Sequence, residues 1–258
     1  MEGSSFEGDC EFSSPQTLVL VGRKGNGKSA TGNNILGTKI FKSERRSSGV
    51  TSTCGLKSTI LKDGRRISVI DTPGIDINYG NFCMICCRIS NNGESFICYL
   101  FYVCDKTHAG ILSSCVDTEF AEEIINMVIG NGIHAFLVVL SVRSRFSKEE
   151  EAAISRLLSF FGSKVYDYMI LVFTGGDYLE KDDETLEDFL HDCPEKLKEI
   201  LSLCENRCVL FDNKTEDQTK RSDQVEKLFS IVNMVSIKND GKLYNNEMFT
   251  EWKVISIF

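Results

Sequence analysis

Eight consecutive residues near the N-terminus have the types and spacing needed to bind the phosphates of a nucleotide. The stretch GRKGNGKS, from Gly22 to Ser29, follows the pattern GxxxxGK[ST]. In such a loop the backbone N–H groups turn inward around the phosphates, the lysine (Lys28) pairs with the β- and γ-phosphates, and the last hydroxyl (Ser29) coordinates Mg²⁺. The expected phosphate-binding residues are Gly22, Arg23, Lys24, Gly25, Asn26, Gly27, Lys28, Ser29 and the following Ala30.

The turn DTPG supplies a second set of phosphate-sensing groups. It follows the apolar run RRISVI, as expected for an aspartate, Asp71, that ends a strand and holds Mg²⁺, usually through water. The N–H of Gly74 would contact the γ-phosphate. DTPG alone is a common turn, but its position downstream of the phosphate-binding loop from Gly22 to Ser29 (the P-loop) indicates a nucleotide switch. Ile75 and Asp76 follow in place of a water-positioning glutamine, so we expect slow intrinsic hydrolysis.

A threonine in the polar loop after the first helix is expected to complete the metal site. Thr51 is the candidate for the switch threonine that caps Mg²⁺ and assists catalysis, and Thr53 competes with it. A solvated loop threonine is the alternative, because loops are rich in threonine for ordinary turn reasons. The expected metal ligands are therefore Ser29, Thr51 and Asp71.

Two later segments are candidates for recognising the base. Asp177 ends FTGGD after an apolar strand, and its carboxylate can accept hydrogen bonds from guanine N1–H and the N2 amino group. Thr174 and Gly175 replace the Asn and Lys of the usual motif NKxD, so base specificity depends mainly on Asp177. A helix N-cap is the alternative role for this aspartate. Asn213, in LFDNKT after the next strand, lies where a loop would close over the base.

Two arginines follow the strand HAFLVVLSV, at the end of a buried strand where ligands of open α/β sheets bind. Arg143 or Arg145 could reach the nucleotide of a partner molecule as an arginine finger. Arg145, which precedes Phe146 and a helix cap, is the preferred catalytic candidate on the family resemblance given below. The alternative is a surface arginine paired with Glu149 or Glu150.

The elements that must position these residues alternate between strands and helices. Apolar runs predict buried strands, Asp63-Gly64 predicts a hairpin, and Ser147 with Glu150 forms a capping box. The expected strands cover 17–21, 56–72 (two strands), 134–142, 168–174 and 207–211, and the expected helices cover 28–36, 116–130, 147–161, 195–204 and 222–237. This alternation predicts an α/β fold of the three-layer P-loop NTPase class, with a mostly parallel sheet and one antiparallel strand.

A segment at about 78–115 separates DTPG from the helix expected over 116–130. It lacks stable periodicity, and an unstructured loop of this length is unusual inside a compact domain. A metal site would need partners for Cys83-x-x-Cys86, and no second CxxC exists. A second interpretation is that the segment is a genuine insertion, because loops tolerate added length. The most economical interpretation is a retained intron or a faulty gene model. The segment is rich in Cys, Phe, Tyr, Leu, Ile and Ser, and thymine-rich codons would give this composition.

Composition narrows the possible partners and compartments. A formal charge of -8 and a pI near 5.1 argue against a nucleic-acid-binding surface. The N-terminus has no signal-peptide pattern and the longest apolar run in the middle, 96–104, is far too short for a membrane helix, so we expect a cytoplasmic protein that could associate peripherally with an endomembrane. Without a secretion signal, the 11 cysteines are expected to be free thiols.

Six stretches, in order, resemble the AIG-type, or GIMAP, family of immunity-associated GTPases, especially its plant branch. They are LVLVGRKGNGKSATGNNILG, SSGVTSTC, VIDTPG, IHAFLVVLSVRSRFSKEEE, VFTGGD and LFDNKT. The resemblance covers about 17–77 and 117–248. It implies a septin-like GTPase domain, related to the chloroplast import receptor GTPases, that binds GTP or GDP with Mg²⁺ and often dimerises across the nucleotide face. Arg145 matches the family's arginine position.

The expected organisation is therefore a disordered tail (1–15), an AIG-type G domain (16–248) interrupted at about 78–115, and a divergent C-terminus (249–258). We expect a Mg²⁺-dependent GTP- and GDP-binding protein with slow GTPase activity, acting as a nucleotide-controlled switch or dimerising module. By family resemblance its role is in defence or stress responses. The alternative is a non-hydrolysing nucleotide-binding interaction module whose second switch is disabled by the interruption.

Overall fold

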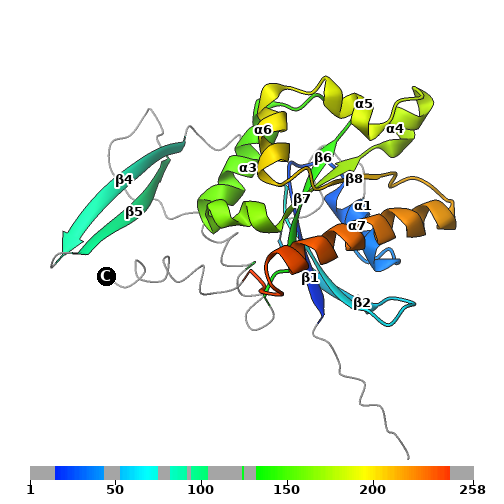
Figure 1. The fold of residues 1–258 in the computed structure, drawn as a ribbon, viewed down its shortest axis with the longest axis horizontal. Coiled ribbons are helices and arrows are strands. Elements are labelled where there is room, and N and C mark those ends of the chain that lie inside the picture. The colour runs from blue at the N-terminus through cyan, green and yellow to red at the C-terminus, as the bar shows by residue number, and fades with distance from the viewer. Residues whose placement is uncertain are drawn as a thin grey trace, which may run out of the picture.

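The computed structural model of the chain describes residues 15–43, 53–74, 82–91, 94–103, 124 and 132–244. Its main sheet has six strands in the order β2-β3-β1-β6-β7-β8 (Figure 1). The strands are β1 (Gln16–Val21), β2 (Gly55–Ile60), β3 (Arg66–Asp71), β6 (Ala135–Ser141), β7 (Met169–Thr174) and β8 (Cys208–Phe211). Strand β2 runs antiparallel to β3, and all other neighbours are parallel. The predicted mixed sheet with one antiparallel strand is confirmed.

Helices cover both faces of this sheet. Helices α1 and α7 lie on one side and α3 and α6 on the other (Figure 1). The helical elements are α1 (Lys28–Leu36), α3 (Lys148–Phe161), the 3₁₀ helix η1 (Ser163–Tyr168), α4 (Gly176–Lys181), α5 (Leu186–His191), α6 (Glu195–Leu203) and α7 (Gln218–Lys238). None of the helices in the described ranges is long and apolar enough to span a bilayer.

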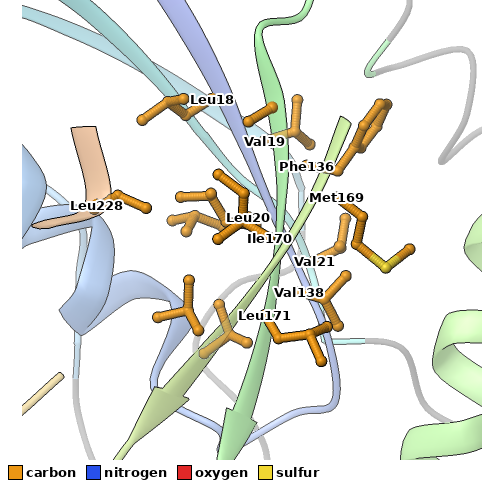
Figure 2. Packing of buried hydrophobic residues seen from close by; sticks show 14 of the residues in the cluster. Leu18, Val19, Leu20, Val21, Phe136, Val138, Met169, Ile170, Leu171 and Leu228 are labelled. Carbon is orange, nitrogen blue, oxygen red and sulfur yellow. The ribbon is translucent and has the colours of Figure 1, made fainter. Parts of the chain in front are cut away.

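The apolar strand runs explain why the sheet lies at the centre. In β1, alternate side chains point to opposite faces, so a strand covered on both sides must be apolar at every position. Leu18 and Leu20 point toward Leu228 of α7, whereas Val19 and Val21 point to the other side, where Phe136 also lies (Figure 2). All of these side chains are at most 1% exposed. Because β1 is apolar on both faces, helices pack against both sides of the sheet.

The interruption after DTPG forms a second, two-stranded sheet. Strands β4 (Phe82–Asn91) and β5 (Glu94–Val103) pair antiparallel, from Phe82 opposite Val103 to Asn91 opposite Glu94. The expectation that this segment is an unstructured loop is therefore wrong for these residues. Its sequence is rich in residues with high strand propensity, and two adjacent strands satisfy each other's backbone groups without a long periodic pattern. Of the helix expected over 116–130, only Ile124 lies within the described residues, where it is helical and buried.

Two other boundaries differ from the sequence prediction. The acidic segment 180–192 contains the end of α4 and all of α5, which were not expected. Thr185 and Asp188 explain α5, because they form a capping box that satisfies its free N–H groups. Helix α7 begins at Gln218, earlier than expected, because the Asp217 side chain accepts hydrogen bonds from the first turn. Three described cysteines are free thiols, as predicted: Cys193, Cys204 and Cys208.

Candidate nucleotide-binding site

The sequence-predicted groups meet at one edge of the main sheet. Strands β1, β3, β6, β7 and β8 all have their carboxyl ends there, because β1 is parallel to β3 and β6 and the order continues in parallel through β7 to β8. Ligands of open α/β sheets bind outside the carboxyl ends of the strands. The loops after these strands therefore form one candidate site, although they are far apart in sequence.

The P-loop connects β1 to α1 in a conformation that needs glycine. Gly22 has a φ of 141°, and a Cβ there would lie 2.5 Å from the carbonyl oxygen of Val139 in β6. Any other residue would both adopt a disfavoured backbone conformation and clash with that backbone. The glycine thus allows the loop to pass close to β6 before it turns into the first helix.

Lys28 lies beneath this loop. Its side chain is 6% exposed, and Nζ donates hydrogen bonds to the carbonyl oxygens of Gly22 and Arg23, both at 3.1 Å. Burial lowers the pKa of the ammonium group to about 8, and the nearby charge of Asp71 offsets part of that effect. Lys28 is therefore held at the inner side of the loop. A phosphate bound there would supply a negative charge that stabilises the protonated form of the buried ammonium group.

The two described metal-ligand candidates are already in contact. Ser29 Oγ donates a hydrogen bond to Asp71 Oδ2 at 2.6 Å, and Asp71 is 2% exposed. Thr72 Oγ1 donates to the carbonyl of Leu20 at 2.6 Å, which ties the DTPG turn to the end of β1. A hydroxyl and a carboxylate oxygen are ligands that Mg²⁺ prefers. Among the described residues, no three His, Cys, Asp or Glu side chains group as an alternative metal site.

DTPG also lies against the P-loop itself. A Cβ on Gly74 would lie 2.5 Å from the Cα of Lys24, so only glycine allows this approach. Gly74 therefore packs directly against the P-loop, which brings the DTPG turn next to the expected phosphate-binding loop. Thr51 lies outside the described residues, and its competitor Thr53 is exposed. The structure therefore leaves the choice between the two threonines open.

Asn26 anchors the P-loop to the neighbouring strands and to α3. Its side-chain amide donates hydrogen bonds to the carbonyl of Val139 at 3.0 Å and to Glu150 Oε1 at 3.3 Å. Thr174, at the end of β7, donates from its hydroxyl to the Asn26 carbonyl at 2.8 Å. The threonine that replaces Asn in the usual base-recognition motif thus still links that motif to the P-loop.

Asp177 lies in the first turn of α4 and is held by two cations. Arg143 Nη2 donates to both carboxylate oxygens at 2.5 Å, and Lys214 Nζ donates to Oδ2 at 2.8 Å. Burial alone would raise the pKa of Asp177, but the hydrogen bonds from Lys214 and Arg143 outweigh it and hold the pKa below its ordinary value. The carboxylate is therefore ionised and remains a hydrogen-bond acceptor, as recognition of guanine requires.

Asn213 joins the loop after β8 to α1. Its Oδ1 accepts a hydrogen bond from Asn34 at 2.7 Å, and its Nδ2 donates to Thr31 Oγ1 at 3.0 Å. Nδ2 also lies 3.2 Å from the position that a Cβ on Gly27 would occupy. The residue is thus near the P-loop, but its side chain is engaged with α1, and the residue of this loop that reaches Asp177 is Lys214.

Arg145 lies in the turn between β6 and α3 and is exposed. Neither of the predicted pairs forms. Glu150 accepts from the backbone N–H of Ser147 at 2.9 Å and from Asn26, while a hydrogen bond from Ser147 holds the pKa of Glu149 below its ordinary value. Within the described part of the chain, Arg145 makes no ion pair, so its guanidinium is available to a group from outside.

Sequence reasoning missed three contacts in this site. Arg143 was noted beside Arg145 but not as a partner of Asp177, and Lys214 and the Asn26–Glu150 link were not identified. Lys214 follows Asn213 directly, so its position at a strand end was a usable signal. The Asn26–Glu150 pair has no local signal, because the two residues are separated by 124 positions.

Comparison with known sequences gives a consistent result. The chain matches the AIG1 family over residues 16–95 and 107–256. It is 46% identical over 258 residues to Immune-associated nucleotide-binding protein 9 of Arabidopsis thaliana, covering 97% of this chain and 65% of the relative. It is 41% identical over 248 residues to Immune-associated nucleotide-binding protein 8 of the same plant, covering 93% and 60%. The chain thus spans less than two thirds of the length of these relatives.

Solved structures show the same fold. The chain is similar to Arabidopsis thaliana Toc33 in complex with GDP and Mg²⁺, with a TM-score of 0.57, 17% identity, and coverage of 90% of this chain and 88% of that one. A Toc33 complex with Mg²⁺ and GMPPNP gives a TM-score of 0.56 at 15% identity, with coverage of 89% and 87%. At these identities the similarity establishes the fold, a P-loop GTPase domain like that of Toc33.

Proposed function

The chain belongs to the AIG1 family of nucleotide-binding GTPases, and from that premise we propose that it is a Mg²⁺-dependent GTP- and GDP-binding protein with slow intrinsic GTPase activity. It acts as a nucleotide-controlled switch or dimerising module. The names of its plant relatives, immune-associated nucleotide-binding proteins, support a role in defence or stress responses. The structural neighbour Toc33 has been solved with GDP, GMPPNP and Mg²⁺, which supports the choice of ligands.

The contact between Ser29 and Asp71 carries this proposal. The hydroxyl that ends the P-loop and the carboxylate that begins the DTPG turn lie within 2.6 Å of each other, across two different strand ends. A P-loop that served only as a structural turn would not need a buried carboxylate beside its last hydroxyl. The pair instead fits a Mg²⁺ ion, which Ser29 and Asp71 would hold and which would offset the negative charge of bound phosphates.

The residues of the chain divide the work of binding. The P-loop N–H groups and Lys28 bind the phosphates, with Ser29 and Asp71 on the metal side. The N–H of Gly74 lies beside the same loop and responds to the presence of a γ-phosphate. Asp177 accepts hydrogen bonds from the N1–H and N2 amino groups of guanine, donors that adenine does not present in that position.

Hydrolysis depends on a second molecule in this proposal. Ile75 and Asp76 follow DTPG in place of a glutamine that could orient water. Arg145 is exposed beside the candidate site and free of ion pairs with the described residues, so it can reach the nucleotide of a partner. One of the related structures comes from work reporting that dimerization is important for the GTPase activity of atToc33 and psToc159, and another is a dimerization-deficient arginine-to-alanine mutant of Toc33.

Single-turnover hydrolysis measured across protein concentrations tests the proposal. GTP, GDP and ATP are first titrated against the full chain with and without Mg²⁺, and guanine nucleotides should bind more tightly than ATP. The GTP hydrolysis rate per molecule should then be low in dilute protein and rise with concentration. Fast hydrolysis independent of concentration would contradict the role of a partner, and failure to bind guanine nucleotides would contradict the function itself.

A non-hydrolysing nucleotide-binding module is the second candidate. The β4–β5 sheet favours it, because this extra unit lies in the chain between DTPG and the helix expected to complete the second switch. The module would bind nucleotide through the P-loop but fail to close the switch. Deleting residues 78–115 separates the two candidates. A gain of hydrolysis in the deletion variant supports the inactive module, whereas equal hydrolysis in both proteins supports a working GTPase.

A further inference from the structure

The base-recognition segment of this chain lacks two side chains of the usual motif, because Thr174 replaces the Asn and Gly175 replaces the Lys. In NKxD a lysine stands two positions before the aspartate it accompanies, and here Gly175 occupies that position. Gly175 has a φ of 98°, a conformation that favours glycine. Because glycine has no side chain, the space above the β7–α4 turn must be filled by another part of the chain or by solvent.

Arg143 fills this space from the end of the neighbouring strand β6. Its Cγ and Nε both lie 3.3 Å from the position that a Cβ on Gly175 would occupy. The side chain then continues to Asp177 and donates to both carboxylate oxygens. It is half-buried, with 35% of the side chain exposed, and the Asp177 side chain is only 18% exposed. The arginine therefore crosses the turn and ends on the candidate base-recognising group.

We propose that Arg143 is a positioning residue of the base site, which replaces the missing lysine and holds Asp177 for guanine. This inference rests on the proposed guanine-nucleotide binding. Both contacts to Asp177 come from one nitrogen, Nη2, whose position is set by the planar guanidinium, so the group restrains the carboxylate more than a freely rotating ammonium would. A carboxylate offers about four acceptor sites, and the contacts from Arg143 and Lys214 use three of them. One site on Oδ1 is open to guanine, and the second guanine donor would take the site on Oδ2 that the 49% exposed Lys214 side chain would vacate.

Titration of three Mg²⁺-bound probes against the full chain tests this role. GDP depends on the base and the phosphates, ADP presents the wrong base, and inorganic tripolyphosphate presents phosphates alone. Arg143→Ala should weaken GDP binding about tenfold, the loss expected for one charge-assisted restraint. Affinity for ADP and tripolyphosphate should stay within about twofold of the unaltered chain, because neither probe uses Asp177 as a base acceptor. Arg143→Lys should recover part of the GDP affinity.

Lys238→Ala provides a matched control. Lys238 pairs with Asp167 and Glu205, its side chain is 34% exposed, and its partners lie before β7 and β8, at the opposite edge of the sheet. Its loss should leave all three affinities unchanged. If Arg143→Ala fails to fold, Arg143→Met, which keeps an unbranched stem, repeats the comparison. Circular dichroism and thermal melting establish the folded state of each variant.

The outcomes separate this inference from the function on which it depends. Unchanged GDP affinity in Arg143→Ala would overturn it. Tighter GDP binding would also overturn it, because Arg143 would then block Asp177. Equal weakening of GDP and tripolyphosphate would overturn it too, since the effect would lie in the whole site. An unaltered chain that binds no guanine nucleotide would contradict the proposed function and this inference with it. If the unaltered chain binds GDP and the Arg143 variants bind it with the same affinity, only this inference is contradicted.

Discussion

The side-chain amide of Asn26 in the P-loop donates a hydrogen bond to Glu150 in the first turn of α3, with an Nδ2–Oε1 distance of 3.3 Å. Glu150 is 1% exposed, and its other oxygen accepts from the backbone N–H of Ser147, which caps the same helix. One carboxylate thus connects the phosphate-binding loop to the turn that carries Arg145. The P-loop and the N-terminal end of α3 therefore share one buried acceptor group.

Replacement of Glu150 by alanine should destabilise the protein. The change removes one of the two acceptors of the buried Asn26 amide and the acceptor of the helix-cap N–H, and we expect a loss of about 2 kcal/mol in the free energy of unfolding. Urea denaturation followed by circular dichroism measures it. Glu150→Gln, which keeps an acceptor oxygen, should lose less. Equal stability of the alanine variant and the unaltered chain would show that the link contributes nothing.

Ser29→Ala and Asp71→Asn should remove the Mg²⁺ dependence of nucleotide binding. Each change deletes one oxygen donor from the candidate metal site, and we expect GDP affinity in Mg²⁺ to fall by at least about tenfold. Isothermal titration with Mg²⁺ and with a chelator measures the effect. Both variants should match the unaltered chain when the chelator is present, and a loss that persists there would indicate damage to the loop instead.

Asp177→Asn should exchange preference for guanine with preference for xanthine. Xanthine carries a carbonyl in place of the N2 amino group, so an amide donor suits it while a carboxylate repels it. GDP affinity should fall about 10- to 100-fold, as expected for loss of charge-assisted hydrogen bonds. Competition between GDP and xanthosine diphosphate measures the exchange. If the variant keeps its guanine preference, Asp177 acts only as a cap of α4.

Arg145→Ala should abolish the concentration dependence of hydrolysis. If the guanidinium acts on a partner's nucleotide, its loss lowers the rate in concentrated protein by at least about tenfold and leaves the low rate in dilute protein unchanged. Single-turnover assays at several concentrations test this, with GDP affinity measured in parallel. A uniform fall at all concentrations would place Arg145 in its own site rather than in a partner's.

His134 should make stability depend on pH in the mildly acidic range. Burial lowers its pKa to about 4, and its Nδ1 accepts a hydrogen bond from the Thr17 N–H at 3.0 Å, so the folded state holds the neutral ring. The unfolded ring takes up a proton near pH 6.5. This contribution is therefore present above about pH 6.5 and is lost as the pH falls toward 4, by up to about 3 kcal/mol.

Urea denaturation at pH 7.5 and pH 5 measures this dependence. His134→Asn keeps an acceptor for Thr17 but cannot titrate, so its stability should change less between the two pH values. The exposed His191 provides the control, and His191→Asn should keep the pH dependence of the unaltered chain. If the slope persists in His134→Asn, other groups cause it.

The P-loop, the DTPG turn and the strands and helices of the main sheet other than α4 and α5 were predictable from local sequence. The P-loop and DTPG are local patterns, and each is flanked by an apolar run whose period fixes the strand or helix beside it. The predicted strands, the Asp63-Gly64 hairpin and the end of α3 at Gly162 agree with the structure for this reason. The local sequence around each of these features was therefore sufficient to predict it.

Which distant side chains meet became visible only in the folded structure. Arg143 and Asp177 are 34 residues apart, and Asn26 and Glu150 are 124 apart. Their contacts depend on the order β1-β6-β7 and on the parallel register that brings the strand ends to one edge. The same series of elements is compatible with several sheet orders. The pairing of β4 with β5 could likewise not be predicted from the hydrophobic periodicity of the sequence. The stability of a strand pair depends on contacts between the two strands, and neither strand specifies these contacts alone.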